Sequence, residues 1–244
     1  MQHDSITPYK NSEAKKDQVA NMFDNISHRY DFLNNLLSFG IQKGWRKKCV
    51  KLLLNHKPQI ILDVATGTAD FALECIVLKP QQIIGIDISE GMMKIGREKI
   101  KKKGFENIIK LEQASAENFN YPNNSFDTIV IGYGVRNFEN LEMGLNNLLR
   151  VLKPGGKMVI LEFSYPKNPF IKAIYTFYFS YITPIIGRIF SKDPRAYSYL
   201  TESVKAFPNN ENFTAILEKC GFINSNFKSL SFGVAAIYTS EKRK

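Results

Sequence analysis

The stretch from Ile60 to Asp70 constrains the fold of this chain more than any other. An apolar run, Ile60–Leu62, leads into Asp63 and Val64, and the small residues Ala65-Thr66-Gly67-Thr68-Ala69 follow. This order predicts a buried strand, a tight turn and a helix over residues 70–78. Unpaired N–H groups at the start of a helix make such a turn a cradle for a ligand, although an ordinary strand-to-helix connection would look the same.

A second apolar run ends in a second acid, in Ile83-Ile84-Gly85-Ile86-Asp87. An acid about 20 residues after such a turn is placed to accept hydrogen bonds from ribose hydroxyls. The turn holds a single glycine, Gly67, so it matches neither the Gly-x-Gly-x-x-Gly pattern of nicotinamide sites nor a phosphate-binding Gly-x-x-x-x-Gly-Lys-Ser loop. Asp63 would repel a pyrophosphate but suits a cationic group, such as the amino group of S-adenosylmethionine.

Composition sets the class of protein. The 244 residues allow one large α/β domain, and 44% hydrophobic residues are enough for a core. A net charge of +10 favours nucleic acid or an anionic membrane surface as partner, or is a solubilising surface charge. The cysteines, Cys49, Cys75 and Cys220, show no metal-ligand spacing, so we expect no metal site and a reducing cytosol. No uncharged run reaches the ~18–20 residues that span a bilayer.

The hydrophobic pattern divides the chain into four parts. We expect a flexible N-terminus over residues 1–12, an N-terminal helical cap over 13–57, a main domain over 58–240 and a charged tail over 241–244. The cap would contain one helix from Asp17 and another over Trp45–Leu54. In the main domain, further strands are expected at 108–113, 126–131 and 157–163, helices at 89–103, 141–152 and 213–220, a turn at 153–156, and a closing antiparallel pair at 222–230 and 234–239.

Strands that alternate with helices predict a doubly wound, mostly parallel sheet. Ligands of such sheets lie beyond the carboxyl ends of the strands, where the strand order reverses. One rim should therefore gather residues that are far apart in the sequence: Asp63, Gly67, Thr68, Asp87, Ser115, residues 132–137 and Glu162.

Residues 165–208 interrupt this alternation and are rich in aromatic residues between Phe170 and Phe190. Pro184 and Gly187 divide the segment into two short helices. The segment is either a lid or apolar substrate channel beside the rim, or plain core packing.

Taken together, these segments resemble the UbiE/MenG family of quinone-biosynthesis methyltransferases, which belong to the class I S-adenosylmethionine-dependent methyltransferases. That class has a Rossmann-like, seven-stranded sheet with an antiparallel last strand, which agrees with the closing pair. The matching segments extend over most of the chain: residues 22–31, 37–41 with Trp45-Arg46, 63–70, Gly132-Tyr133-Gly134-Val135-Arg136-Asn137, 161–164, 197–203 and 233–238.

The resemblance implies methylation of a ring carbon on a polyprenylated quinol, above all demethylmenaquinol to menaquinol, the last step of menaquinone biosynthesis. Thr68 and Asp87 would contact S-adenosylmethionine, together with Asp63 and Gly67, and Ser115-Ala116 would border the adenine. Gly132 would also lie at the cofactor, where some members have a serine. Ala65 and Ala69 occupy positions where the wider class has glycine, and alanine fits there only if the backbone keeps a negative φ.

A sulfonium methyl group is already a strong electrophile, so the enzyme must orient the ring and raise its electron density. A cation near the developing phenolate would stabilise charge in the transition state. Arg136 is the candidate for that role, and Tyr133 could position the ring. The alternative for Arg136 is a structural ion pair with Glu139 or Glu162.

The prenyl tail would remain in the bilayer, so we expect a cytoplasmic enzyme at the inner face of the membrane. Basic helices and the aromatic segment would bind an anionic membrane surface, more weakly as salt rises. An RNA methyltransferase and a small-molecule O-methyltransferase are the competing functions. Nucleic acid is not the expected partner, because no Asn/Asp-Pro-Pro-Tyr follows the fourth strand and no cysteine lies near it. A homo-oligomer is compatible with the sequence.

Overall fold

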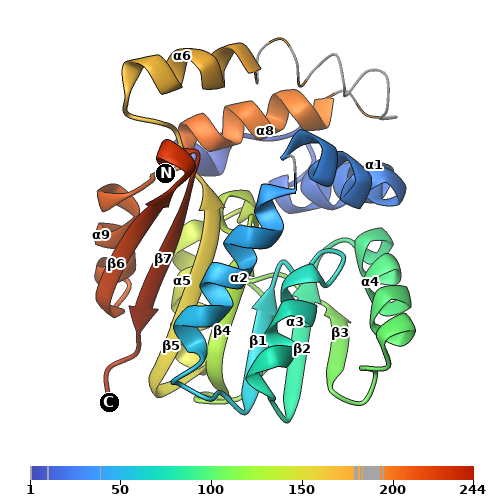
Figure 1. Ribbon diagram of the computed structural model, residues 1–244, viewed down its shortest axis with the longest axis vertical. Coiled ribbons are helices and arrows are strands. Elements are labelled where there is room, and N and C mark those ends of the chain that lie inside the picture. Colours follow the sequence, from blue (N-terminus) through green and yellow to red (C-terminus); the bar gives the residue numbers. More distant parts are fainter. Residues whose placement is uncertain are drawn as a thin grey trace.

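The computed structural model describes residues 2–9, 11–38, 40–178, 181, 183, 193 and 195–244. Its centre is a seven-stranded sheet in the order β3-β2-β1-β4-β5-β7-β6 (Figure 1). Strand β7 is antiparallel to both of its neighbours, and the remaining pairs are parallel, which confirms the predicted fold class. The strands are β1 (Ile60–Val64), β2 (Gln82–Asp87), β3 (Ile109–Gln113), β4 (Phe126–Gly132), β5 (Leu152–Phe163), β6 (Ile223–Leu230) and β7 (Ala235–Glu241).

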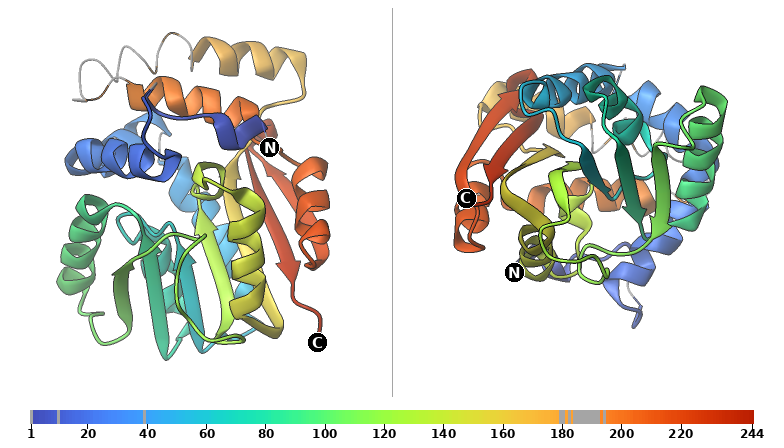
Figure 2. Two further views of the ribbon diagram at one scale, coloured as in Figure 1. Left: turned by 180° about the vertical axis from the view of Figure 1, so that it is seen from behind. Right: turned by 90° about the horizontal axis from the view of Figure 1, so that it is seen from below.

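Helices cover both faces of the sheet. One face carries α2 (Ile41–Leu53), α3 (Asp70–Cys75) and α4 (Glu90–Lys103). The other carries α5 (Leu141–Val151) and α9 (Glu211–Lys219), which lie in front when the molecule is seen from behind (Figure 2). Sequential βα units produce this arrangement, because right-handed crossovers that run from β1 toward β3 and from β4 toward β5 go in opposite directions along the sheet and so place their helices on opposite faces.

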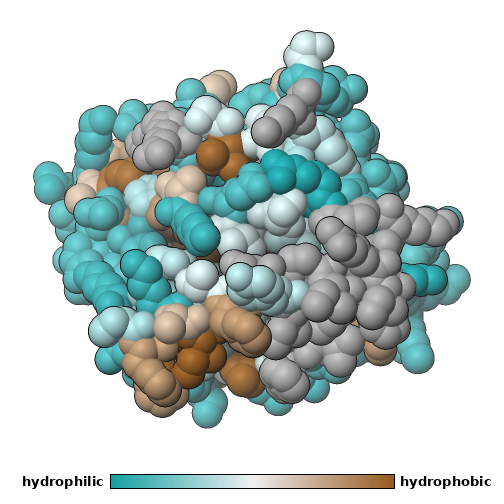
Figure 3. Space-filling view, turned by 90° about the horizontal axis from the view of Figure 1, so that it is seen from above, coloured by the Kyte–Doolittle hydropathy of each residue, from teal (hydrophilic) through white to brown (hydrophobic). Residues whose placement is uncertain are grey.

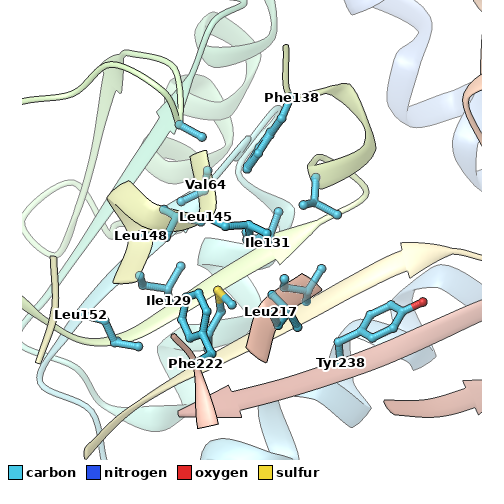
Figure 4. Packing of buried hydrophobic residues seen from close by; sticks show 14 of the residues in the cluster. Val64, Ile129, Ile131, Phe138, Leu145, Leu148, Leu152, Leu217, Phe222 and Tyr238 are labelled. Atoms are coloured by element: carbon cyan, nitrogen blue, oxygen red, sulfur yellow. The ribbon is translucent and has the colours of Figure 1, made fainter. Parts of the chain in front are cut away.

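The apolar spacing of each helix explains which side it buries. Leu141, Leu145 and Leu148 recur at helical intervals along α5 and are fully buried against the sheet. Figure 4 shows Leu145 and Leu148 packed with Ile129 and Ile131 of β4. Burial of each such side chain stabilises the fold by about 1.5–3 kcal/mol, so this layer anchors the strand that leads to the rim.

The carboxyl ends of all the strands except β7 lie toward a cap of helices at the top of Figure 1. This cap consists of α1 (Lys15–Leu37), α6 (Pro169–Phe177), α8 (Arg195–Ala206) and the 3-10 helix η1 (Gln2–Ser5). Val19 and Met22 of α1 pack there with Tyr197 and Tyr199 of α8. Helix α2, expected as part of an N-terminal cap, instead packs on the sheet through Trp45 and neighbouring residues.

Residues 2–9 differ from the flexible segment that was expected. His3 is 1% exposed, and its ring meets Phe207 edge to face at 5.6 Å. Lys15 Nζ donates to the carbonyl of His3 at 3.0 Å, and Arg195 Nε donates to the carbonyl of Pro8. The segment is ordered by contacts with α1 and α8 that are distant in sequence.

The helix predicted over residues 89–103 is confirmed as α4. Ser89 caps α4 by accepting a hydrogen bond from the N–H of Met92 at 3.2 Å. The predicted turn at residues 153–156 is wrong: these residues form an irregular part of β5, where Gly155 has a φ of 73°. The break between two helices that was expected at Pro184 and Gly187 lies outside the described residues, as do the aromatic residues Phe179 and Phe190. No helix within the described part is long and apolar enough to cross a bilayer.

Candidate active site

The turn after β1 is built on left-handed backbone. Gly67 has a φ of 54°, but Ala65 (53°) and Ala69 (62°) have positive φ as well, so the expectation of negative φ at the two alanines is wrong. A left-handed alanine is disfavoured by about 1–2 kcal/mol relative to glycine. The side chain of Ala65 lies directly against the β4 loop, where a Cβ added to Gly134 would be 2.3 Å from Ala65 Cβ. Gly134 is therefore the residue that makes room for Ala65.

Asp63 lies at the end of β1 and is fully buried. Its Oδ2 accepts hydrogen bonds from Thr66 Oγ1 at 2.7 Å and from the N–H of Ala72 at 3.0 Å. Its Oδ1 is buried and has no hydrogen-bond partner among the described residues. Burial raises the pKa of Asp63 to about 7, so one half of this carboxyl group is left to receive a donor or a cation.

Asp87 ties the turn to the neighbouring strand. Its Oδ2 accepts from the N–H of Gly67 at 2.7 Å, and its Oδ1 accepts from the N–H of Ser89 at 2.9 Å. Burial raises the pKa of Asp87 to about 6. The predicted meeting of the two acid-ended strands at one rim is therefore present, with Asp87 in direct contact with the cradle turn.

Helix α1 reaches over this turn through ion pairs. Lys99 of α4 contacts Asp31 of α1 at 2.8 Å and also pairs with Asp70. Thr68 donates to Asp31 Oδ1 at 2.7 Å and accepts from Lys99 Nζ at 2.9 Å. Arg46 of α2 completes the group by contacting Asp70 at 2.9 Å. The Thr68 hydroxyl thus has protein partners in this arrangement.

Two cavities meet at the rim. The polar one has a volume of about 700 Å³ and is lined by Asp63, Gly67, Thr68 and Gly132, among others. The apolar one, of about 320 Å³, is lined by side chains of α1, α6 and α8 and by Arg136. The two share the lining residues Tyr30, Asn34, Ser38, Gln42 and Tyr133. The polar cavity thus adjoins the apolar one, and Tyr30 and Tyr133 lie at their junction.

The predicted residues are distributed unevenly over these cavities. Ser115, Ala116 and Asp87 line neither of them. Ser115 Oγ accepts from the N–H of Asn118 at 3.2 Å, and Ala116 packs into the core on the α5 side of the sheet. Gly132 packs against the ring of Phe71, and a Cβ added to Gly132 would lie 3.0 Å from Phe71 Cδ1. A serine there would crowd Phe71.

Tyr133 and Arg136 lie together on the loop that follows β4. Tyr133 has a φ of 59°, its ring stacks on Phe163 at 4.6 Å, and its buried hydroxyl has no hydrogen-bond partner in the described part of the chain. Arg136 Nη1 contacts Glu162 Oε1 at 2.9 Å and donates to the carbonyl of Tyr133. Arg136 Nε is buried and, within the described ranges, unpartnered.

The sequence offered Glu139 and Glu162 as ion-pair partners of Arg136. The structure pairs Arg136 with Glu162, which is fully buried at the end of β5. Glu162 also accepts from the N–H groups of Arg136 and Phe163. Burial raises the pKa of Glu162, and the Arg136 charge opposes that effect. The carboxylate fixes the guanidinium at the wall of the apolar cavity, with donor capacity to spare.

The family of the chain follows from comparison with known proteins. The model of the ubiE/COQ5 methyltransferase family matches residues 11–242. The chain belongs to the ubiE/COQ5 methyltransferase family. Members similar to it include a demethylmenaquinone methyltransferase of Bacteroides fragilis, 45% identical over 98% of each chain. The ubiquinone/menaquinone biosynthesis C-methyltransferase UbiE of Geobacter sulfurreducens is 44% identical over 97% of this chain and 93% of its own.

Solved structures share the fold of this ubiE/COQ5 family member. A SAM-dependent methyltransferase of Thermotoga maritima superposes with a TM-score of 0.61 at 20% identity, over 91% of this chain and 99% of its own. Phosphoethanolamine N-methyltransferase 2 of Haemonchus contortus, solved with S-adenosyl-L-methionine, gives a TM-score of 0.55 at 16% identity, over 76% and 49%. At these identities the likeness shows the fold alone.

Sequence reasoning missed Tyr30, which lines both cavities. Burial raises the pKa of its hydroxyl. Tyr30 is part of the segment 22–31 that matches the family, but no feature of the sequence distinguishes it from a core residue of the predicted helix. Its role at the cavity junction depends on where α1 lies, which is a long-range property. No group of three metal-ligating side chains occurs among the residues that the structure describes.

Proposed function

We propose that this chain transfers a methyl group from S-adenosylmethionine to a ring carbon of a polyprenylated demethylnaphthoquinol, which makes it a demethylmenaquinone methyltransferase. The observation that carries the proposal is the junction of the polar and apolar cavities at Tyr133. A polar chamber suits the charged methyl donor, and an apolar chamber suits the ring. The names of the relatives, demethylmenaquinone methyltransferase and UbiE, support the same reaction.

The residues of the polar cavity fit the donor. Asp63 Oδ1 is the buried acceptor, unpartnered within the described chain, that a protonated amino group requires. The left-handed turn through Gly67 brings backbone close to the cavity, and Asp87 holds that turn in place. S-adenosylmethionine, when bound, supplies an electrophilic methyl group. Asp63, Gly67, Thr68 and Gly132 would hold it, and Ser115 and Ala116 are proposed to border the adenine.

The apolar cavity would activate the other reactant. A quinol that loses a hydroxyl proton gains electron density at its ring carbons. Arg136, fixed by Glu162, can donate a hydrogen bond to the phenolate oxygen and so lower the pKa of that hydroxyl. Tyr133, stacked on Phe163, provides a flat aromatic surface beside the ring. The aliphatic and aromatic walls exclude water, which strengthens these interactions.

The substrate class also implies a location. A polyprenyl tail keeps the quinol in the bilayer, so we place the protein at the cytoplasmic face of the membrane that holds its substrate. Self-association into a homo-oligomer is a separate proposal that sedimentation equilibrium tests.

The deciding experiment is methyl transfer from labelled S-adenosylmethionine to reduced demethylmenaquinone, with the product identified by mass. A product heavier by one methyl group on carbon is expected. The benzoquinol analogue, a catechol and transfer RNA serve as competing acceptors. Labelling of transfer RNA or of a catechol oxygen, with no label in the quinols, would refute the proposal in favour of one of the two competing functions.

The role of Arg136 needs a variant that folds. Loss of one partner of a buried ion pair destabilises by about 3–5 kcal/mol, so Arg136→Ala alone is ambiguous. Arg136→Met with Glu162→Gln removes both charges while keeping similar volume. We expect it to fold, to bind the donor, and to lose at least about a hundredfold in kcat. A folded double variant with normal turnover would make the pair purely structural.

A further inference from the structure

Helix α6 presents an apolar stripe to solvent. Three of its members recur at positions i, i+4 and i+7 of α6, and the fourth, Tyr181, follows the helix and lies with its ring 5.3 Å from that of Phe177. They are 54–72% exposed: Phe170, Ile174, Phe177 and Tyr181. We call this set the exposed stripe. Figure 3 looks down on this end of the molecule and shows hydrophobic side chains gathered along one edge. Four large apolar side chains on and directly after one short helix are more than scattered surface residues and indicate an interaction surface.

The stripe continues into the mouth of the apolar cavity. Ile174 belongs to both, since it lines the cavity and is 54% exposed. Ile41, at the start of α2, also lines the cavity and is 46% exposed. Ile171, Tyr175 and Tyr178, on the inner side of the same helical segment, line the cavity as well. The opening is therefore rimmed by apolar side chains from two separate elements.

The size of the cavity decides what must cover this rim. At about 320 Å³ it lies at the lower end of the volumes that hold small molecules, about 300–1,000 Å³. It can hold the ring and the beginning of a tail, so a long prenyl chain must leave through the mouth. Exposure of that chain to water is unfavourable in proportion to its apolar surface. The mouth therefore has to face a hydrocarbon phase, which a bilayer supplies.

We propose that α6 and Ile41 form a membrane-docking rim, with the exposed stripe inserted into the acyl region of a lipid bilayer so that the quinol enters without leaving hydrocarbon. This inference rests on the proposed function, because the long tail is what requires the bilayer. The rim is apolar more than charged. Lys167 is partnered by Glu211 at 2.9 Å, and Lys172 lies over the ring of Tyr165 at 5.2 Å.

The main basic helix does not face the same way. Helix α4 starts directly after the carboxyl end of β2, so its last turn, Lys101–Lys103, points toward the opposite end of the sheet from α6 (Figure 1). Binding should therefore depend mainly on apolar insertion and only weakly on salt. This differs from the salt-sensitive contact that the basic composition alone suggests.

The test compares vesicle binding with methyl transfer. Phe170→Ser/Phe177→Ser removes two stripe residues that do not line the cavity, and Val77→Ser/Leu52→Ser removes two apolar side chains of comparable exposure (62% and 49%) elsewhere. Flotation with phosphatidylcholine vesicles, with and without phosphatidylglycerol, measures partitioning. We expect the stripe variant to lose about tenfold in partitioning, and the control variant to match wild type.

Methyl transfer to two different quinols separates the docking rim from the proposed function. With long-tailed quinol in vesicles, the stripe variant should lose kcat/KM by the same factor, whereas with a tailless demethylnaphthoquinol in solution it should equal wild type. Unchanged partitioning of the stripe variant, or binding abolished by moderate salt, would overturn the docking rim. A wild-type dimer that the stripe variant dissociates would make a second copy the occupant instead. Absence of transfer to both the long-tailed and the tailless quinol by the wild-type protein would refute the proposed function, whatever the vesicles show.

Discussion

We predict that Asp63 makes binding of the methyl donor depend on pH. The carboxyl group is fully buried, its Oδ1 has no hydrogen-bond partner among the described residues, and burial raises its pKa to about 7 from 3.8. Hydrogen bonds from Thr66 and Ala72 oppose this rise, and the nearby charge of Asp87 adds to it. At neutral pH the unliganded protein is thus divided between a protonated and an ionised Asp63, and only the ionised form attracts an amino group strongly.

The expected size follows from that pKa. The ionised fraction of Asp63 rises from about one tenth at pH 6 to about one half at pH 7, while an α-amino group with a pKa near 7.7–8.0 stays mostly protonated. The affinity for S-adenosylhomocysteine, which carries the same amino group, should therefore increase about fivefold between pH 6 and pH 7. At pH 7 binding should release about half a proton, because it drives Asp63 fully into the ionised form.

The same raised pKa of Asp63 makes the unliganded protein less stable as the pH rises. The folded pKa of Asp63 lies above its unfolded value, so the folded state binds more protons between pH 3.8 and 7. The stability contributed by protonated Asp63 is fully present below pH 3.8 and is lost as pH rises through about 7. Between pH 6 and pH 7 this loss is about 1 kcal/mol, and Asp63→Asn should remove it.

Calorimetry at pH 6, 6.5 and 7, in two buffers with different ionisation enthalpies, measures both affinity and proton release. Asp63→Asn is the matched control, because it keeps the shape and removes the titration. Wild-type affinity that is flat over this range would refute the reasoning. So would an Asp63→Asn variant that keeps the wild-type slope, because another group would then carry the linkage.

Three further predictions concern the frame around the site. Gly134→Ala should destabilise by about 1–3 kcal/mol in urea unfolding, since its Cβ would lie 2.3 Å from that of Ala65, and adding Ala65→Gly should restore most of the loss. Lys99→Met should raise the KM for the donor several-fold and increase amide exchange of α1, because Lys99 joins α1 to the cradle; an unchanged KM would contradict this. Burial lowers the pKa of His3 to about 4 from 6.5, so stability should fall by about 2 kcal/mol from pH 7 to pH 5, and His3→Phe should abolish that part of the fall.

The strand and helix order could be predicted from sequence because its signals are local. The apolar run at Ile60–Leu62, the cap at Ser89 and the leucine spacing from Leu141 each determine their own segment. The contact between Asp87 and the turn that follows Asp63 was expected from a single topological rule, that parallel strands end at one edge of the sheet. This rule needs no knowledge of side-chain packing.

The features that the sequence did not reveal depend on tertiary contacts. The position of α1 over the cradle is set by Asp24 and Asp31, whose partners Ser89, Gly91 and Lys99 belong to a distant part of the sequence. Without that position, Tyr30 was indistinguishable from a core residue. The order of residues 2–9 has the same origin, because His3 meets Phe207 from the other end of the chain.

The left-handed residues show how the site divides into rigid and mobile parts. Ala65 and Tyr133 both have positive φ. Ala65, after β1, lines the polar cavity, and Tyr133, after β4, lies where the two cavities meet. Such strain persists only where the surroundings over-determine the backbone, and here the paired strands β1 and β4 and their buried side chains do so. The cradle and the Arg136 loop are therefore a fixed frame. Helix α1 is joined to the cradle and to the start of α4 by one partly exposed ion pair, Lys99 with Asp31, which is individually weak, and by a few hydrogen bonds of Asp24 and Asp31. Admission of donor and product release should then proceed by movement of α1, with the strained loops unchanged.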